Sequence, residues 1–217
     1  MRGRAGDSTL RTGDAGPGRS RTRPDRRQGL GAAIVLRSLR EIARDAWWDW
    51  RLGIRTLAST PSVGGGAKPG EPTGYDVLFA VAAAFGPGDV VYDVGCGRGR
   101  ACAVFARTGA RVIGVEVSPR AAAAARRNRI AVIEGDARTV DYADATALWM
   151  FNPFGPETLR TVLRRAHAPR VVYYSGTETH ADVFLAEGYA LHRRQAAGDS
   201  EHTVYHYARA ADSFHPI

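Results

Sequence analysis

Residues 90–100, which read Val-Val-Tyr-Asp-Val-Gly-Cys-Gly-Arg-Gly-Arg, decide the fold that we expect for this chain. The apolar run Val90–Val94 has the composition of a short buried strand, and three glycines follow it before a helical segment begins at Arg100. Glycine allows a tight turn and a close approach of the backbone to a ligand, because it has no Cβ. The stretch therefore predicts a strand, a ligand-binding turn and a helix, in that order.

The rest of the C-terminal part repeats this alternation. Three further strands are expected at 111–116, 131–134 and 147–151, a fourth at 170–174, and helices at 100–108, 118–128 and 156–166. Beyond a helix at 180–187, two runs at 189–194 and 203–208 predict a closing antiparallel hairpin. Alternating strands and helices form parallel sheets through right-handed crossovers. We therefore expect an α/β fold, a Rossmann-like three-layer sandwich whose mostly parallel seven-stranded sheet ends in an antiparallel hairpin.

The N-terminal part has a different composition. Residues 1–28 contain eight Arg and three Asp among Gly and Pro, which predicts a disordered basic tail that carries +5 of the net charge of +8. Residues 32–57 predict a long amphipathic helix, and residues 58–74 predict a Gly-rich linker or lid. A second helix is expected at about 75–85. We thus divide the chain into a tail (1–28), a helix with its linker (29–74) and one main domain (75–217).

The long N-terminal helix carries an apolar stripe and a cluster of tryptophans. The apolar residues that follow helical spacing are Val35, Leu39, Ile42, Ala46 and Trp50. We expect Trp47, Trp48 and Trp50 to pack this helix onto the main domain; the alternative is that they help to line a pocket for the substrate.

The composition also limits the class of protein. The two cysteines, Cys96 and Cys102, make neither a disulfide framework nor a zinc site, and no apolar run is long enough to span a membrane. We expect a reduced, cytoplasmic protein with no metal and no membrane partner. Only one of the 30 basic residues is a lysine, Lys68, which indicates GC-rich coding and weakens the case for a nucleic-acid partner.

Three features around the glycine loop narrow its ligand. Asp93 precedes Gly95 by two residues, where a carboxylate can accept hydrogen bonds from an ammonium group. Arg100 stands where a nicotinamide-binding loop requires Gly or Ala, which disfavours a dinucleotide. Glu116 ends the next strand, about twenty residues after the loop, where an acid can bind both hydroxyls of a ribose. Together these features make the glycine loop a more specific signal than a glycine-rich turn alone.

With these motifs, residues 75–208 resemble the class I S-adenosylmethionine-dependent methyltransferases. The resemblance implies that S-adenosylmethionine is the cofactor, with Asp93 and the glycine loop at its methionine part and Glu116 at its ribose. It further implies that Asp136 accepts a hydrogen bond from the adenine amine, with the backbone of Ala137 beside the ring. The cofactor-binding residues that we expect lie in four segments at the ends of strands: Asp93, Gly95, Cys96, Gly97 and Gly99; Glu116 and Val117; Asp136 and Ala137; and Asn152.

The fourth segment is Phe151-Asn152-Pro153-Phe154, which is similar to the Asn/Asp-Pro-Pro-aromatic motif of methyltransferases that act on amino nitrogens. One proline is missing, so the aromatic residue comes one position early. The resemblance implies that Asn152, Pro153 and Phe154 position the acceptor; the alternative is a plain turn with Phe154 packed inward. Tyr75 is expected either to close over the cofactor or to pack in the core.

We therefore predict a methyltransferase that acts on a small molecule or on a peptide or protein, and we favour an amino nitrogen as the acceptor. An oxygen acceptor would need a base, for which His180 is the best-placed loop histidine, although a polar residue at a helix start is the simpler interpretation. Three alternatives stay open: a nicotinamide-dependent oxidoreductase, an RNA methyltransferase or nucleic-acid binder, and an adenosylmethionine enzyme such as a lyase or cyclase. The sequence does not indicate the oligomeric state.

Overall fold

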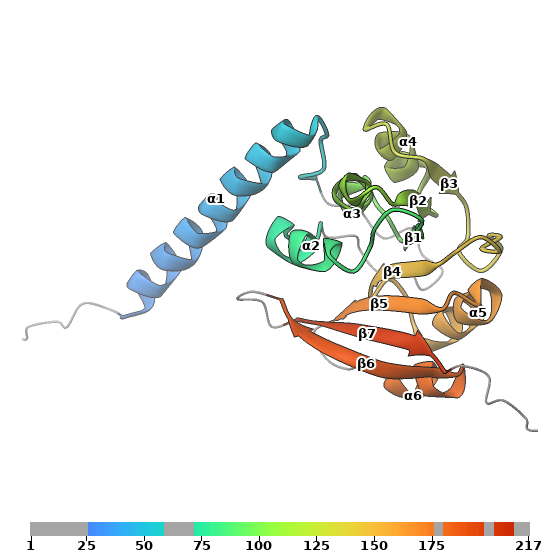
Figure 1. The fold of residues 1–217 in the computed structure, drawn as a ribbon. Coiled ribbons are helices and arrows are strands. Elements are labelled where there is room, and N and C mark those ends of the chain that lie inside the picture. Colours follow the sequence, from blue (N-terminus) through green and yellow to red (C-terminus); the bar gives the residue numbers. More distant parts are fainter. Residues whose placement is uncertain (1–25, 59–71, 176–179, 198–201, 211–217) are drawn as a thin grey trace, which may run out of the picture. The chain divides into compact units, whose positions relative to one another are not determined.

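A seven-stranded sheet is the main element of the computed structural model, which describes residues 26–58, 72–175, 180–197 and 202–210 (Figure 1). Its strands are β1 (Val90–Val94), β2 (Arg111–Glu116), β3 (Val132–Glu134), β4 (Ala147–Phe151), β5 (Arg170–Ser175), β6 (Tyr189–Ala196) and β7 (Thr203–Arg209). They lie in the order β3-β2-β1-β4-β5-β7-β6, and only the pairs β5–β7 and β6–β7 are antiparallel. The predicted α/β fold with its closing hairpin is confirmed.

Contacts within the chain divide it into two units, Met1–Leu39 and Arg40–Ile217. The described part of the first unit is the N-terminal portion of helix α1 (Arg26–Leu52), and every other element belongs to the second unit. The remaining helices are α2 (Tyr75–Ala82), α3 (Arg100–Phe105), the 3-10 turn η1 (Ala106–Thr108), α4 (Pro119–Arg127), α5 (Pro156–Ala166) and α6 (Ala181–Ala186). Most of the predicted tail (1–25) and linker (59–71) lies outside the described residues.

Two hydrophobic layers cover the sheet, one on each face. On one face, α2 and α3 pack against strand residues that include Val91, Trp149 and Tyr174. On the other face, α5 and α6 pack against the alternate residues, such as Leu148, Met150 and Tyr173. Strand β4 follows β3 without an intervening helix. The loop between β3 and β4 covers the second face of the sheet near β1. There the ring of Tyr142 packs on the ring of Tyr92, with 5.0 Å between their centroids.

The turns between strands and helices use residues that suit them. Ser118 caps α4, since its hydroxyl accepts a hydrogen bond from the amide of Ala121 at 3.4 Å. The second predicted helix, 75–85, is shorter than expected and ends at Ala82. The segment predicted as one helix at 100–108 tightens into η1 after Phe105, because Gly109 then adopts a left-handed φ of +87°.

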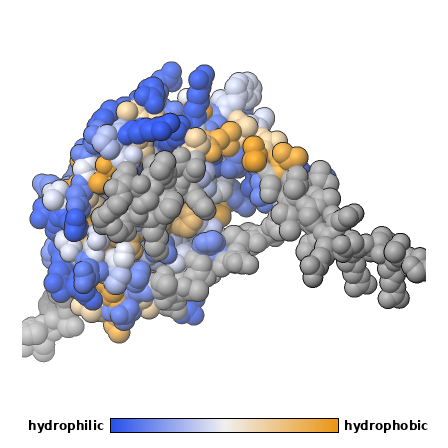
Figure 2. All heavy atoms as spheres, turned by 180° about the vertical axis from the view of Figure 1, so that it is seen from behind, coloured by the Kyte–Doolittle hydropathy of each residue, from blue (hydrophilic) through white to orange (hydrophobic). Residues whose placement is uncertain are grey.

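Helix α1 differs from its prediction in its bounds and in the face it buries. It begins at Arg26 rather than at residue 32, and it ends at Leu52 because Gly53 takes a left-handed φ of +68°. Three residues of the predicted apolar stripe are exposed instead of packed on the domain: Leu39 (56%), Ile42 (54%) and Trp50 (75%). Figure 2 shows hydrophobic residues on the surface along this helix. Of the three tryptophans expected to pack on the main domain, Trp47 and Trp50 are exposed, whereas Trp48 packs on two rings of α2, with centroid distances of 4.4 Å to Phe79 and 6.0 Å to Tyr75.

In the described part of the chain, no helix is long and apolar enough to cross a membrane.

Candidate active site

The glycine loop between β1 and α3 has a backbone that side chains would disturb. Gly95, Gly97 and Gly99 adopt φ values of +85°, +55° and +85°, which non-glycine residues rarely reach. A Cβ on Gly99 would lie 2.5 Å from Cγ1 of Ile130, and one on Gly95 would lie 3.0 Å from Cβ of Pro153. The loop is anchored to β2, since the amides of Gly95 and Cys96 both donate to the carbonyl of Val115. Its glycines are therefore required by conformation and by close packing.

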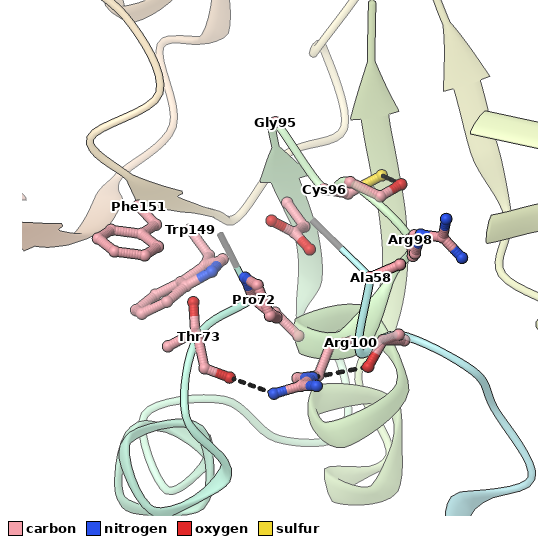
Figure 3. Close-up of a pocket in the computed structure, with 13 residues that line it drawn as sticks. Ala58, Pro72, Thr73, Gly95, Cys96, Arg98, Arg100, Trp149 and Phe151 are labelled. Carbon is pink, nitrogen blue, oxygen red and sulfur yellow. Dashed lines mark hydrogen bonds between the residues drawn. The ribbon is translucent and has the colours of Figure 1, made fainter. Parts of the chain in front are cut away.

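A cavity opens beside this loop on the face that α2 and α3 cover (Figure 3). The empty space in it, open mouth included, is about 490 Å³. Three parts of the chain line it: Thr56, Ala58, Pro72 and Thr73 on the N-terminal side; Asp93, Gly95, Cys96, Gly97, Arg98, Arg100 and Ala101 around the loop; and Trp149 and Phe151 from β4. The cavity thus includes the predicted methionine-binding loop.

Asp93 is the buried acid of this cavity. It is 3% exposed, and the thiol of Cys102 donates a hydrogen bond to its Oδ2 at 3.1 Å. Burial raises the pKa of Asp93 from 3.8 to about 7, although hydrogen bonds from Cys102 act in the opposite direction. The hydrogen bond with Cys96, followed by burial, raises the pKa of the Cys102 thiol well above its ordinary value, so this thiol stays protonated. A carboxylate kept from water in this way is suited to bind a cationic group.

Glu116, the predicted ribose acid, closes over the glycine loop from the end of β2. Its Oε2 accepts a hydrogen bond from the amide of Gly97 at 2.8 Å, and its Oε1 accepts one from the amide of Ser118 at 2.8 Å. Each carboxylate oxygen has a further lone pair for a ligand hydroxyl. Glu116 is 8% exposed, so it also shapes the loop that it contacts. Val117, the next residue, is exposed.

Asp136, the predicted adenine acid, lies on the surface after β3 in an ion pair with Arg138. The guanidinium of Arg138 donates to both carboxylate oxygens, at 2.5 Å from Nη2 to Oδ2 and 3.0 Å from Nε to Oδ1. These hydrogen bonds lower the pKa of Asp136. Ala137 is partly buried against the core. An adenine amine at Asp136 would therefore share the carboxylate with Arg138 or displace it.

The segment after β4 divides between the cavity and the core. Phe151 lines the cavity, whereas Phe154 is buried in the core beneath α5 and α6. Asn152 has a left-handed φ of +34°, and its Oδ1 accepts a hydrogen bond from the hydroxyl of Tyr173 at 2.8 Å. Pro153 packs on Gly95. The turn thus lies against the glycine loop, but the aromatic residue that reaches the cavity precedes Asn152 instead of following it.

The two other predicted candidates lie in different surroundings. Tyr75 is fully buried, and its hydroxyl donates to Oδ1 of Asp49 at 2.6 Å. His180 caps α6 with a left-handed φ of +74°, and its ring lies 6.5 Å from that of Tyr173 on the opposite face of the sheet from α2 and α3. The structure thus places the Tyr75 ring in the core, with its hydroxyl bonded to α1.

Sequence reasoning missed the buried ionic network beneath the cavity. Arg100, 4% exposed, donates from Nη1 to Oδ2 of Asp45 at 2.5 Å and to the carbonyl of Thr73 at 3.1 Å. Its Nε donates to Oγ1 of Thr56 at 2.7 Å, and its guanidinium lies 4.6 Å from the centre of the Tyr75 ring. Arg100 thereby connects α1 with Thr56 and Thr73, which line the N-terminal side of the cavity. The feature of the sequence that could have indicated this network is a pair of acids on one helix, Asp45 and Asp49, four residues apart.

Comparisons with known proteins agree with this geometry. Residues 91–169 match a family of protein domains described as a methyltransferase domain. No curated protein sequence matches the chain. Among solved structures, a TehB-like SAM-dependent methyltransferase from Corynebacterium glutamicum has a TM-score of 0.51 at 18% identity, with 63% of this chain and 88% of that chain covered.

Two further structures contain the cofactor or its product. Magnesium protoporphyrin IX methyltransferase from Synechocystis, with bound SAM, has a TM-score of 0.52 at 16% identity and covers 62% of this chain and 76% of that one. An RNA methyltransferase from Salinibacter ruber, in complex with S-adenosyl-L-homocysteine, has a TM-score of 0.50 at 24% identity, with 65% and 95% covered. At these identities the likeness shows the fold alone, and the domain match carries the activity. Residues 91–169 are therefore a methyltransferase domain, and the chain has the fold of S-adenosylmethionine-dependent class I methyltransferases.

Proposed function

We propose that this enzyme transfers the methyl group to an amino nitrogen of a small molecule or peptide. When bound, S-adenosylmethionine supplies a methyl group on a good leaving group, so the protein has to align the nucleophile and exclude water more than it has to provide strong acids or bases. The residues present fit this cofactor, since Asp93 offers a buried carboxylate and the glycine loop leaves room that a Cβ would fill.

The observation that carries the choice of nitrogen is the hydrogen bond from Tyr173 to Oδ1 of Asn152. Because the Tyr173 hydroxyl donates this bond, the Asn152 side chain is oriented with its amide oxygen as the acceptor. That oxygen has a second lone pair, which can accept another hydrogen bond. An amine with an N–H on that lone pair would have its own lone pair free to attack the methyl carbon. The turn at Asn152 lies against the glycine loop through Pro153, which supports a place near the cofactor's reactive end.

The test replaces Asn152 with Ala in an assay that follows release of S-adenosylhomocysteine across a panel of amines and amino peptides. We expect turnover to fall at least about tenfold, equal to roughly 1.4 kcal/mol, while the affinity for S-adenosylhomocysteine stays unchanged. Tyr173→Phe is the matched variant, because it keeps the ring and removes only the donor to Asn152. Equal turnover of wild type and Asn152→Ala, with saturating cofactor, would reduce the segment to a structural turn.

A second candidate, an oxygen acceptor, is favoured by His202. Its ring packs on Phe151 at 5.7 Å and on Tyr174 at 5.1 Å between centroids, so an imidazole, which can accept a proton, lies behind Phe151 in the wall of the cavity. In this case His202→Gln would abolish turnover, and Asn152→Ala would have little effect. The opposite pattern supports nitrogen.

The other acceptors and chemistries are separated by the same assay. Mass spectrometry of the acceptor distinguishes methyl transfer from lyase or cyclase chemistry, in which the cofactor is consumed and no acceptor gains a methyl group. A nucleic-acid acceptor would use the basic residues at 1–28, and salt-dependent RNA binding that disappears on their removal would favour it.

A further inference from the structure

The C-terminal half of helix α1 exposes apolar side chains along one face. Ile42, Ala46 and Trp50 follow one another at four-residue spacing, so they lie on the same side of the helix. Ile42 and Trp50 are 54% and 75% exposed, and Trp47, three residues before Trp50, is 49% exposed. Figure 2 shows hydrophobic residues on the surface along this helix. Neighbouring exposed apolar residues of this kind mark an interaction surface.

The domain is attached to the opposite face of the same stretch. Asp45 accepts a hydrogen bond from Arg100 at 2.5 Å, and Asp49 accepts one from Tyr75 at 2.6 Å. Trp48 packs on a ring of α2, with 4.4 Å between the centroids. These contacts hold the helix on the domain by one side, so its apolar side faces away from the domain. A partner can therefore cover the apolar face without displacing the domain.

Basic side chains line one flank of the apolar face. Arg40, Arg44 and Arg51 are all exposed, and their spacing of four and seven residues places them along one side of the helix. Arg51 lies over the ring of Trp47, 5.9 Å from its centre, and Arg44 lies 3.6 Å from Oδ1 of Asp76. Two of the three acids of α1 are bound to the domain, so the flank is cationic.

The positive charge continues through the N-terminal part of the sequence. Residues 1–58 contain 13 Arg against six acids, a net of +7, whereas residues 59–217 carry only the remaining +1. A second copy of this chain would bring the same charge to the face, and like charges disfavour that contact. The complementary partner is an extended anionic surface.

We propose that this face of α1 lies on an anionic lipid bilayer, with Trp47 and Trp50 at the level of the headgroups and the basic flank against lipid phosphates. A helix with one apolar face and a basic flank binds in the interface without spanning the membrane. Tryptophan favours that region, because its ring is apolar and its N–H is polar. A short apolar face binds weakly by itself, so the arginines provide the second signal that stable binding requires.

This inference goes beyond the proposed function and holds for any methyl acceptor. It replaces the expectation of no membrane partner, since that expectation concerned segments long enough to span a bilayer.

Sedimentation of the full chain with phospholipid vesicles measures this binding. We expect vesicles of mixed phosphatidylglycerol and phosphatidylcholine to bind the protein at least about tenfold more tightly than vesicles of phosphatidylcholine alone, and high salt to release it. Trp50→Ala should weaken the binding at least about fivefold, because it removes the most exposed apolar side chain of the face. Leu185→Ala is the matched control: Leu185 on α6 is 74% exposed, and this variant should bind as wild type does.

Two variants that lose equal charge test the basic flank. Arg40→Gln/Arg51→Gln should weaken binding to the mixed vesicles at least about fivefold. Arg107→Gln/Arg120→Gln, at exposed positions elsewhere on the domain, should change it less than about twofold. Circular dichroism checks that each variant is folded before the affinities are compared.

The proposal is overturned if wild type does not bind the mixed vesicles, or if it binds both kinds of vesicle equally. Binding of Trp50→Ala equal to that of wild type, or equal effects of the two arginine pairs, would show attraction by overall charge alone and would also overturn it. A dimer in solution that Trp50→Ala converts to a monomer would assign the face to a second copy of this chain. Binding of S-adenosylhomocysteine, measured without vesicles, tests the cofactor assignment separately.

Discussion

Replacing Asp93 with Asn tests two expectations: that this buried carboxylate binds the ammonium group of the cofactor, and that it lowers the stability of the ligand-free protein. Burial raises the pKa of Asp93 from 3.8 to about 7. The folded protein therefore holds a proton that the unfolded chain releases above about pH 4, and the free energy of unfolding falls as the pH rises from about 4 to about 7. At about 1.4 kcal/mol per pH unit, the loss reaches about 4 kcal/mol at most.

An Asn at this position has no charge to desolvate, and its oxygen can still accept from Cys102. We expect the ligand-free Asp93→Asn protein to be more stable than wild type at pH 8, by about 1 to 4 kcal/mol, and equally stable at pH 4. Urea unfolding at the two pH values measures this difference. The variant thus gains stability where the native carboxylate is ionised.

Ligand binding should show the opposite preference. Binding of S-adenosylhomocysteine to wild type requires the ionised carboxylate, so its affinity should rise about tenfold per pH unit from pH 5 to about pH 7, or roughly hundredfold in all. Asp93→Asn should bind weakly, with no such rise. Calorimetry at pH 5, 6 and 7 measures both proteins. A flat profile in wild type, or an Asn variant that is less stable than wild type at pH 8, would refute the assignment of Asp93.

Three further predictions concern other parts of the structure. Glu116→Ala should weaken binding of S-adenosylhomocysteine by a few kcal/mol, because two charge-assisted hydrogen bonds of about 1.5–3 kcal/mol each are lost; unchanged affinity in calorimetry would contradict the ribose assignment. Gly99→Ala should destabilise the protein by at least about 2 kcal/mol in urea unfolding, since its Cβ would lie 2.5 Å from Ile130 at a φ of +85°, and a wild-type midpoint would be inconsistent with this conformation. Trp50→Ala should change the free energy of unfolding by less than about 0.5 kcal/mol, because Trp50 is 75% exposed, whereas Trp48→Ala should cost several-fold more; equal costs would show that Trp50 is buried.

The sequence predicts the sheet well because its signals are local. Strand β1 and the glycine turn are adjacent in the chain, and the alternation of strands and helices determines the parallel order through right-handed crossovers. The same holds for Ser118, whose capping bond spans three residues. A pattern of this kind needs no knowledge of distant contacts.

The ionic network beneath the cavity could not be predicted in this way. Arg100 contacts Thr56 and Asp45, which are 44 and 55 residues away, so no periodicity connects them. The rule that a helix buries its apolar stripe also fails for α1, because the face that meets the domain carries Asp45 and Asp49 beside Trp48. Phe154 is a smaller case: it lies in the core, which is the alternative that the sequence left open.

The fastening of α1 to the loop has a consequence for hydrogen exchange. Local opening of the residues around Asp45 and Asp49 has to break the bonds of Arg100 at the same moment, so these backbone amides and those at the start of α3 should exchange with solvent water as one cooperative unit. A ligand bound in the cavity beside Arg100 would raise the free energy of that opening for both segments together. Binding next to Arg100 would therefore slow deuterium uptake in the C-terminal turns of α1, which lie more than forty residues earlier in the chain.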